Sequence, residues 1–352
     1  MLGWSKARLT CVPMFAMALW VPASSGALAQ TSASAFYKGK SLTIVTSTGA
    51  GGGYDLVARL IARHLPKAMP GIGGVVVQNM PGGGNLRAAN YMYEIAPKDG
   101  TVIGVVENAI PLKQVLEPTN VRFDVTKFNW IGSTGGHNEV IMAMGSAGIA
   151  SVEDLKTREV VLGGTGPGSS IVVYPAAMNS VLGTRFKIVT GYTSSSEIYL
   201  AMDRGEVVAR SGTVPSINIW HPGWVAQGKI RILAQVGLKR DPQMPDIPLI
   251  SELAATPEQR DVLNLISSPA ALGQPYYAPP GVPAERIALL RAAFLDTLRE
   301  PDLLAEAARI QAEIEPMSGE QLTQIILSVI GAPANIVEKA RAAIELKDAV
   351  SR

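Results

Sequence analysis

The chain has 352 residues, of which 47% are hydrophobic and 17% are charged, with 31 lysine or arginine residues against 29 aspartate or glutamate residues. This length is enough for two domains of ordinary size or one large domain. A nearly neutral chain without a basic run argues against nucleic acid or an anionic membrane surface as the partner.

The first 29 residues have the pattern of a secretory signal peptide. Lys6 and Arg8 precede an apolar run over 9–21, and small residues then lead to Ala-Leu-Ala at 27–29, which matches a cleavage site. A membrane anchor is the alternative, but this run is shorter than the roughly 20 residues that a spanning helix needs. We therefore expect cleavage after residue 29 and a periplasmic location. Cys11 is the single cysteine and lies in this segment, so the mature chain is predicted to contain no disulfide.

Predicted strands and helices alternate through most of the remaining chain. Short apolar runs typical of strands occupy residues 42–46, 74–79, 101–106, 129–132, 140–144, 160–163, 186–190, 207–211 and 230–237. Helical patterns lie between them at 56–65, 86–95, 151–155, 170–182 and 194–204. From Pro283 onward the pattern is helical, at 284–299, 302–311, 319–330 and 333–346. This order predicts an α/β fold with mostly parallel sheets and C-terminal helices.

A glycine-rich loop, Thr-Gly-Ala-Gly-Gly-Gly-Tyr-Asp at 48–55, connects the first predicted strand to the first predicted helix. Glycines leave backbone N–H groups uncovered, and a helix start adds unpaired donors and the positive end of its dipole. The loop therefore predicts a site for a carboxylate or a phosphate. Asp55 either supports the loop, which is the favoured interpretation, or orients the ligand. Tyr54 is either a wall of the site or a packing residue.

A second glycine-rich loop at 163–170 leads from a strand into a helix in the same way, with Ser169 and Ser170 placed to cap the helix and to offer hydroxyl groups. An ordinary strand-to-helix connection is the alternative for either loop. Neither loop has nucleotide-binding spacing. The third glycine of G-x-G-x-x-G would fall on Tyr54, and the lysine of a phosphate loop would fall on Ser169.

No catalytic set is found in the sequence. The motifs G-x-S-x-G and H-E-x-x-H are absent, and His64, His137 and His221 lack metal-ligand spacing. We predict no catalytic residue, no metal site and no cofactor. His64 is expected at the surface, and Trp220 is expected to be a packing residue.

Several motifs, taken in order, resemble the periplasmic solute-binding receptors of the tripartite tricarboxylate transporter family, also called the Bug family. The glycine-rich loop at 48–55 is similar to the family's Pro-Gly-Gly-Gly-x-Asp segment, and Gln-Asn-Met-Pro-Gly-Gly-Gly-Asn at 78–85 is similar to its Asn-x-Pro-Gly-x-Gly-Gly-Asn segment. Further stretches that resemble the family lie at 96–101, 191–194, 200–207, 239–252 and 278–283.

The resemblance implies a type II periplasmic binding-protein fold, in which two lobes close on a ligand held in the cleft between them. We expect one lobe from residues 30–136 with 238–352 and the other from 137–237, with the chain crossing at 133–137 and 237–248. The predicted ligand-binding residues are Thr48, Gly51, Gly52, Gly53, Tyr54, Asp55, Gly166, Gly168, Ser169, Ser170, Tyr192 and Thr193.

The expected function is the capture of a small organic carboxylate and its delivery to the membrane subunits of a tripartite tricarboxylate-type transporter, by a monomer. The sequence departs from the family at Ser47, Thr48 and Ala50, and again at Thr193 where lysine is common. The ligand class therefore stays at a small organic acid, aliphatic or aromatic. A ligand-binding sensor for a signalling partner, an exported enzyme that uses the same cleft, and a scaffold without ligand are the alternatives.

Overall fold

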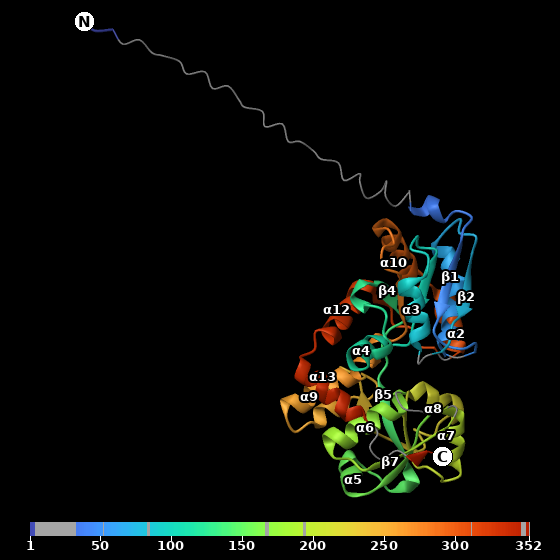
Figure 1. Ribbon diagram of the computed structural model, residues 1–352, viewed down its shortest axis with the longest axis vertical. Coiled ribbons are helices and arrows are strands. Elements are labelled where there is room, and N and C mark those ends of the chain that lie inside the picture. Colours follow the sequence, from blue (N-terminus) through green and yellow to red (C-terminus); the bar gives the residue numbers. More distant parts are fainter. Residues whose placement is uncertain are drawn as a thin grey trace.

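Two six-stranded sheets organise the chain in the computed structural model, which describes residues 1–3, 33–51, 53–82, 85–165, 169–192, 195–310, 312–345 and 350–351. Figure 1 shows the first sheet in the upper half of the molecule and the second in the lower half. The strand order is β11-β4-β10-β3-β1-β2 in the first sheet and β12-β7-β6-β8-β5-β9 in the second.

The strands of the two sheets come from different parts of the chain. The first sheet contains β1 (Ser41–Thr46), β2 (Gly74–Asn79), β3 (Val102–Val105), β4 (Asn129–Ser133), β10 (Pro275–Ala278) and β11 (Met317–Ser318). The second contains β5 (Glu139–Met144), β6 (Val160–Gly163), β7 (Phe186–Thr190), β8 (Ala209–Gly212), β9 (Ile230–Val236) and β12 (Val350–Ser351).

Helices cover the faces of both sheets. They are α2 (Gly53–Ala68), α3 (Leu86–Glu94), α4 (Ile110–Leu116), α5 (Val152–Thr157), α6 (Ser170–Leu182), α7 (Ser195–Asp203), α8 (Val214–Trp220), α9 (Pro257–Ser267), α10 (Ala284–Leu298), α11 (Pro301–Arg309), α12 (Gly319–Ile330) and α13 (Ala334–Ile344). In α2, buried Val57, Leu60, Ile61 and Leu65 form one apolar face that packs into the core of the first sheet. No helix of the described residues is long and apolar enough to cross a bilayer.

Each sheet combines parallel and antiparallel pairs. Strand β1 pairs in parallel with β2 and β3, as a strand–helix–strand crossover requires. Strand β10, however, is antiparallel to both β3 and β4, and β5 is antiparallel to both β8 and β9. Among the described residues, five of the ten pairings are antiparallel. The prediction of mostly parallel sheets is therefore wrong, because β5 and β10 enter their sheets from the other half of the molecule.

Two chain segments connect the sheets and lie against each other. The first, residues 134–138, joins β4 to β5, and the second, residues 268–274, leads into β10. The Ser133 hydroxyl donates to the Leu272 carbonyl, and a Cβ atom at Gly273 would lie 1.8 Å from the carbonyl oxygen of Gly135. Gly273 also has a φ of +59°, which disfavours any residue with a side chain. The junction thus depends on a close backbone approach.

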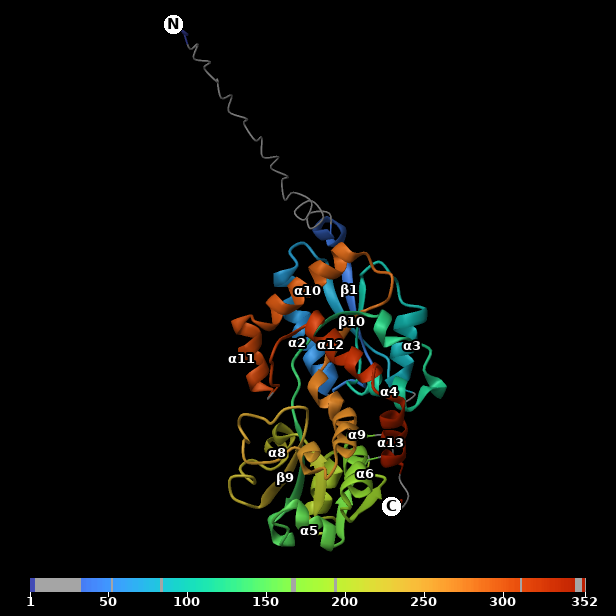
Figure 2. The same ribbon diagram turned by 90° about the vertical axis from the view of Figure 1, so that its left-hand side faces the viewer.

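The packing of the last third of the chain bears on the expected lobes. Helices α9 and α13 lie beside α6 in Figure 2 and share a hydrophobic core with it, and β12 pairs with β7. Residues 237–248 fold back along β9, where the Gln235 side-chain amide donates to the carbonyls of Met244 and Ile247. The lobe limits at 136 and 237 remain a prediction.

His64 differs from its predicted surface location. The residue is 8% exposed, and its Nδ1 and Nε2 atoms lie 2.7 Å and 3.0 Å from carboxylate oxygens of Glu300 and Glu306. The exposed position expected from its neighbour Arg63 is therefore wrong, because Glu300, directly before α11, and Glu306, within α11, cover this part of α2.

Candidate functional site

A cavity of about 660 Å³ lies where the two halves of the molecule meet. Its walls come from the start of α2, the connection between β4 and β5, the starts of α7 and α8, the segment before β10 and the segment after α11. Its lining includes Gly51, Gly53, Tyr54, Leu56, Asn108, His137, Glu139, Ser195, Ser196, Thr213, Trp220, Gly273, Gln274, Ile310 and Glu313. This size is typical of a small-molecule site.

The first turn of α2 forms one wall of the cavity. Gly51 has a φ of +80°, so the loop turns sharply before Gly53 opens the helix. The Tyr54 hydroxyl accepts from the Asn108 backbone N–H at 2.9 Å and lies 3.4 Å from the Gly273 carbonyl oxygen. Burial raises the pKa of this hydroxyl well above its usual value, so Tyr54 is neutral. The helix start therefore faces the cavity with its backbone donors and a neutral phenol.

Asp55 holds the glycine loop from behind. Its carboxylate accepts from the Gly51 backbone N–H at 2.8 Å, from Arg59 Nε at 3.0 Å and from Asn79 Nδ2 at 2.9 Å. The side chain is 2% exposed. The hydrogen bond from Arg59, followed by those from Gly51 and Asn79, lowers the pKa of Asp55 to about 2 against the opposing effect of burial. The ionised Asp55 thus stabilises the loop, and the Gly51 N–H that donates to it is not available to a ligand.

The start of α7 forms the opposite wall and is held by a buried arginine. Ser195 and Ser196 line the cavity at this helix start. Arg210 is 1% exposed, and its guanidinium donates to the Ser195 carbonyl at 3.3 Å, to the Ser195 hydroxyl at 3.2 Å and to the Ser211 carbonyl at 3.0 Å. The same group lies 4.1 Å from the ring centroid of Tyr199. A buried positive charge therefore lies directly behind this helix start.

Glu139, the first residue of β5, brings a carboxylate to the cavity. Ser211 Oγ lies 3.4 Å from one of its oxygens. Burial, with a smaller contribution from Glu107, raises its pKa to about 7, whereas Ser170, Arg210 and Ser211 act in the opposite direction. Glu139 therefore changes its charge near neutral pH.

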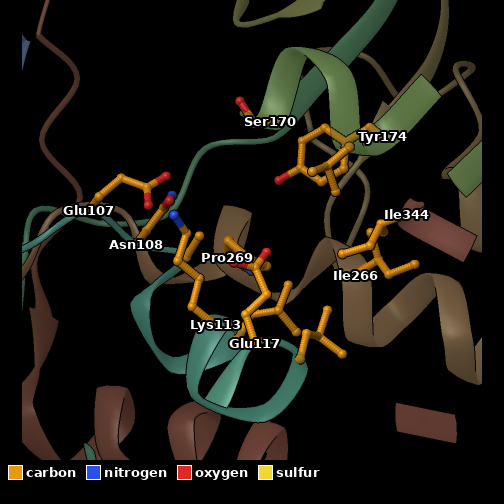
Figure 3. A pocket seen from close by; sticks show the side chains of 13 residues that line it. Glu107, Asn108, Lys113, Glu117, Ser170, Tyr174, Ile266, Pro269 and Ile344 are labelled. Carbon is orange, nitrogen blue, oxygen red and sulfur yellow. The ribbon is translucent and has the colours of Figure 1, made fainter. Parts of the chain in front are cut away.

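A smaller cavity of about 40 Å³ adjoins the first through the shared residue Asn108. Figure 3 shows Glu107 and Asn108 on one side of it and Ser170 and Tyr174, from α6, on the other. Burial raises the pKa of Glu107, and the charge of Lys113 opposes this. Polar groups from both halves of the molecule thus line the smaller cavity.

Comparison with known proteins identifies the family. The model of the tripartite tricarboxylate transporter family receptor matches residues 57–341. The chain belongs to this receptor family. A UPF0065 protein encoded in the gbd 5′ region of Cupriavidus necator is 25% identical over 305 residues, which cover 85% of this chain and 86% of that protein.

Solved structures agree in fold. A TctC solute-binding protein from Polaromonas has a TM-score of 0.67 at 17% identity and covers 87% of this receptor and 98% of that chain. MatC from Rhodopseudomonas palustris, with bound malate, has a TM-score of 0.60 at 18% identity, with coverages of 87% and 99%. The receptor thus has the α/β fold of periplasmic solute-binding proteins, as predicted. Membership in a receptor family confirms the prediction that it is not an enzyme.

The predicted ligand-binding residues of the receptor fall into three groups. Gly51, Gly53 and Tyr54 line the larger cavity, and Ser170 lines the smaller one. Others lie elsewhere: Asp55 is behind the loop, Thr48 Oγ1 lies 3.1 Å from Thr46 Oγ1, Ser169 Oγ accepts from Thr165 Oγ1 at 2.9 Å, and Tyr192 belongs to a core cluster with residues of β5 and α7. Gly52, Gly166, Gly168 and Thr193 lie outside the described residues. Ligand contact for each of these residues remains a prediction.

Sequence reasoning missed several residues that line the receptor's cavity. Glu139 begins an otherwise apolar strand, and this single charged residue was the available signal. Ser195 and Ser196 lie in a run of hydroxyl residues at a helix start, as Ser169 and Ser170 do. Trp220 was expected to be a packing residue, but it is 50% exposed and lines the cavity, because it ends the short helix α8 at the mouth.

Proposed function

We propose that the receptor captures a small organic carboxylate in the 660 Å³ cavity and delivers it to the membrane subunits of a tripartite tricarboxylate-type transporter. One observation carries the proposal: the start of α2, which follows a strand of the first sheet, and the start of α7, which follows a strand of the second sheet, line the same cavity. Helix starts bind anions through unpaired N–H groups and the helix dipole. Bound malate in MatC, which has this fold, supports a carboxylate as the ligand class.

Capture would proceed by closure of the two lobes. A carboxylate that contacts both helix starts gains its second set of hydrogen bonds only when the lobes approach, so binding shifts the population toward the closed form. Each charge-assisted hydrogen bond contributes roughly 1.5–3 kcal/mol, and micromolar affinity corresponds to about 8 kcal/mol. Three or four such bonds therefore suffice after the cost of ordering.

The remaining parts of the proposal concern location and assembly. The receptor is exported by its signal peptide, cleaved after Ala29, and acts in the periplasm as a monomer. Its two lobes are built on the two sheets, with α9, α13 and β12 in the lobe of the second sheet. The closed form is the one that docks on the membrane subunits, because only this form carries the ligand in an enclosed site.

A thermal-shift screen with mono-, di- and tricarboxylates, together with mass spectrometry of co-purified ligand, tests the proposal. The variant Gly53→Leu tests whether the ligand binds at the start of α2. A Cβ atom at Gly53 meets no other atom within 4 Å and the residue lines the cavity, so leucine would fill the site without steric strain. We expect the variant to fold with an unchanged melting temperature and to lose the ligand-induced shift.

Ala305→Leu is the matched control, because it adds the same side chain at an exposed position of α11 outside the cavity. This control should respond to ligand like the unmodified receptor. A Gly53→Leu protein that still binds the acid with full affinity contradicts the assignment of the α2 start. Failure of every acid in the screen contradicts carboxylate capture itself.

A further inference from the structure

The larger cavity has two carboxylates in its wall and no lysine or arginine among its described lining residues. The two carboxylates are those of Glu139 and Glu313. His137 Nδ1 lies 3.0 Å from Glu313 Oε2, so Glu313 already has a side-chain partner at the edge of the cavity. Among the described residues, the Glu139 carboxylate has the neutral hydroxyl groups of Ser211 and Ser170 as hydrogen-bond partners, and the charge of Arg210 acts on it without a hydrogen bond.

A second acceptor lies in the wall of the same cavity. Gln274 lines the cavity, and its Oε1 atom is buried without a hydrogen-bond partner among the described residues. A buried acceptor without a donor costs free energy unless a ligand or water supplies one. The wall of the cavity therefore contains two acceptors, the Glu139 carboxylate and Gln274 Oε1, that donors from a ligand would satisfy.

Positive potential in the cavity comes from other parts of its wall. The starts of α2 and α7 supply it through their backbone, and Arg210 adds to it from behind Ser195 without lining the cavity. The cavity thus has two parts of opposite potential: the helix starts attract an anion, and Glu139 attracts a cation. A ligand with a carboxylate alone matches only the first part.

We propose that the ligand is an organic acid that also carries an ammonium group, with Glu139 as the residue that binds the ammonium and the helix starts as the site of the carboxylate. This inference rests on the proposed function, since it assigns the second group of the same ligand. A dicarboxylate without an amino group would place a second negative charge in a cavity that contains Glu139 and no lysine or arginine among its described lining residues, which is unfavourable.

The test compares acids that differ in one substituent. Three sets span the size range: succinate, malate and aspartate; glutarate, 2-hydroxyglutarate and glutamate; 3-phenylpropionate, 3-phenyllactate and phenylalanine. Dissociation constants are measured by calorimetry at pH 8 on the mature receptor. In the set that binds most tightly, we expect the amino acid to bind at least tenfold more tightly than both the unsubstituted and the hydroxy acid.

Glu139→Gln identifies the residue responsible. The amide keeps the size of the side chain and an acceptor for Ser211, so only the charge is removed. We expect the amino acid to lose at least tenfold in affinity and the unsubstituted acid to bind unchanged or more tightly. Glu153→Gln makes the same charge change on α5, where the side chain is 72% exposed, and should leave all affinities unchanged.

The outcomes separate this inference from the proposed function. Equal affinity of the unsubstituted or hydroxy acid overturns the inference and leaves carboxylate capture standing. The absence of binding by every acid overturns both. A Glu139→Gln protein that keeps its preference for the amino acid overturns the role of Glu139, and the comparison on the unmodified receptor decides the ligand class even where that variant does not fold.

Discussion

Asp55 illustrates how a charged residue beside a ligand cavity can have a structural role. Its two carboxylate oxygens accept from Gly51, Arg59 and Asn79, which fixes the loop before α2. Asn79 in turn donates to the Thr48 carbonyl at 3.0 Å, so the network ties both ends of the glycine run. Of the two interpretations that the sequence left open, the contacts favour the support of the loop.

Replacing Asp55 by asparagine should reduce the stability of the receptor in a pH-dependent way. The folded pKa of about 2 lies below the usual value of 3.8, so the carboxylate stabilises the fold above pH 3.8 and this contribution is lost as the pH falls from 3.8 to 2. The shift corresponds to about 2 kcal/mol. Asp55→Asn should therefore lower the melting temperature by at least a few degrees at pH 7, and the difference should shrink below pH 3.8.

Asp302→Asn provides the control. Asp302, like Asp55, accepts from a basic side chain, here Lys67 at 3.0 Å, but its own side chain is 77% exposed. Solvent screening makes such surface pairs contribute little to stability. Melting curves of both variants at pH 7 and pH 3 would decide the matter. Equal losses for Asp55→Asn and Asp302→Asn would contradict a special role of the loop network.

The contribution of Glu139 to the stability of the fold should change with pH in the opposite direction to that of Asp55. Its folded pKa of about 7 lies above the usual value of 4.5, so the fold holds this proton more strongly than the unfolded chain does. The group therefore favours the folded state less and less as the pH rises from 4.5 to 7. The charges and hydroxyls that act on it are Glu107, Arg210, Ser170 and Ser211.

Glu139→Gln should remove this dependence. Both proteins are measured without ligand. The melting temperature of the variant minus that of the unmodified receptor should be larger at pH 8 than at pH 4.5. A constant difference between the two pH values would show that the Glu139 carboxyl titrates as in water.

At the scale of elements, the sequence predicted most of the fold because its signals are local. All nine predicted strands are present, and the bounds of β2, β6, β7, α6 and α12 agree to the residue. Helix α9 was missed although Thr256 and Gln259 form a capping box at its start. Strand β10 was missed because it has only four residues and begins with a proline.

The site was harder to predict because distant segments build it. The α2 start could be recognised from its glycines, but Glu139, Ser195 and Gln274 come from three other segments. Their proximity follows from the antiparallel insertion of β5 and β10, which no local pattern shows. Sequence reasoning therefore found one wall of the cavity and missed the acidic wall.

The junction between the two sheets predicts a strong effect of one small substitution. In Gly273→Ala the new Cβ atom would lie 1.8 Å from the Gly135 carbonyl oxygen and 2.8 Å from Ser133 Oγ, so the two connecting segments must separate. The backbone of Gly273, with a φ of +59° and a ψ of −129°, adds strain because only glycine adopts this conformation readily. We expect a loss of more than about 3 kcal/mol in stability and weaker ligand binding, measured by melting curves and calorimetry.

Gly183→Ala separates the two causes. Gly183 has a φ of +74° at the end of α6, but no atom lies within 4 Å of its added Cβ. This variant should lose only the backbone contribution and keep its affinity for ligand. If both variants lose the same stability, close approach at the junction contributes nothing.

At the scale of the whole molecule, the mouth of the cavity is apolar on both sides. Leu56 on α2 and Ile310 after α11 are 46% and 39% exposed, and Trp220 at the end of α8 is 50% exposed. All three line the cavity. Exposed apolar side chains at a cleft mark a binding surface, so closure should bring the two sides together and cover them.

Trp220 therefore reports closure by its fluorescence. The other tryptophans after residue 29 are Trp130, which is 1% exposed, and Trp224, which stacks on His221 at 3.7 Å between ring centroids. Ligand should shift the emission of the receptor to shorter wavelength and protect it from quenching by acrylamide, and Trp220→Phe should abolish both effects while Trp224→Phe keeps them. A ligand that only occupied an open cleft would leave Leu56 and Ile310 at their present distance from Trp220. If calorimetry shows that a ligand binds but acrylamide quenching does not change, closure is contradicted. The receptor would then have no enclosed form in which to deliver its ligand.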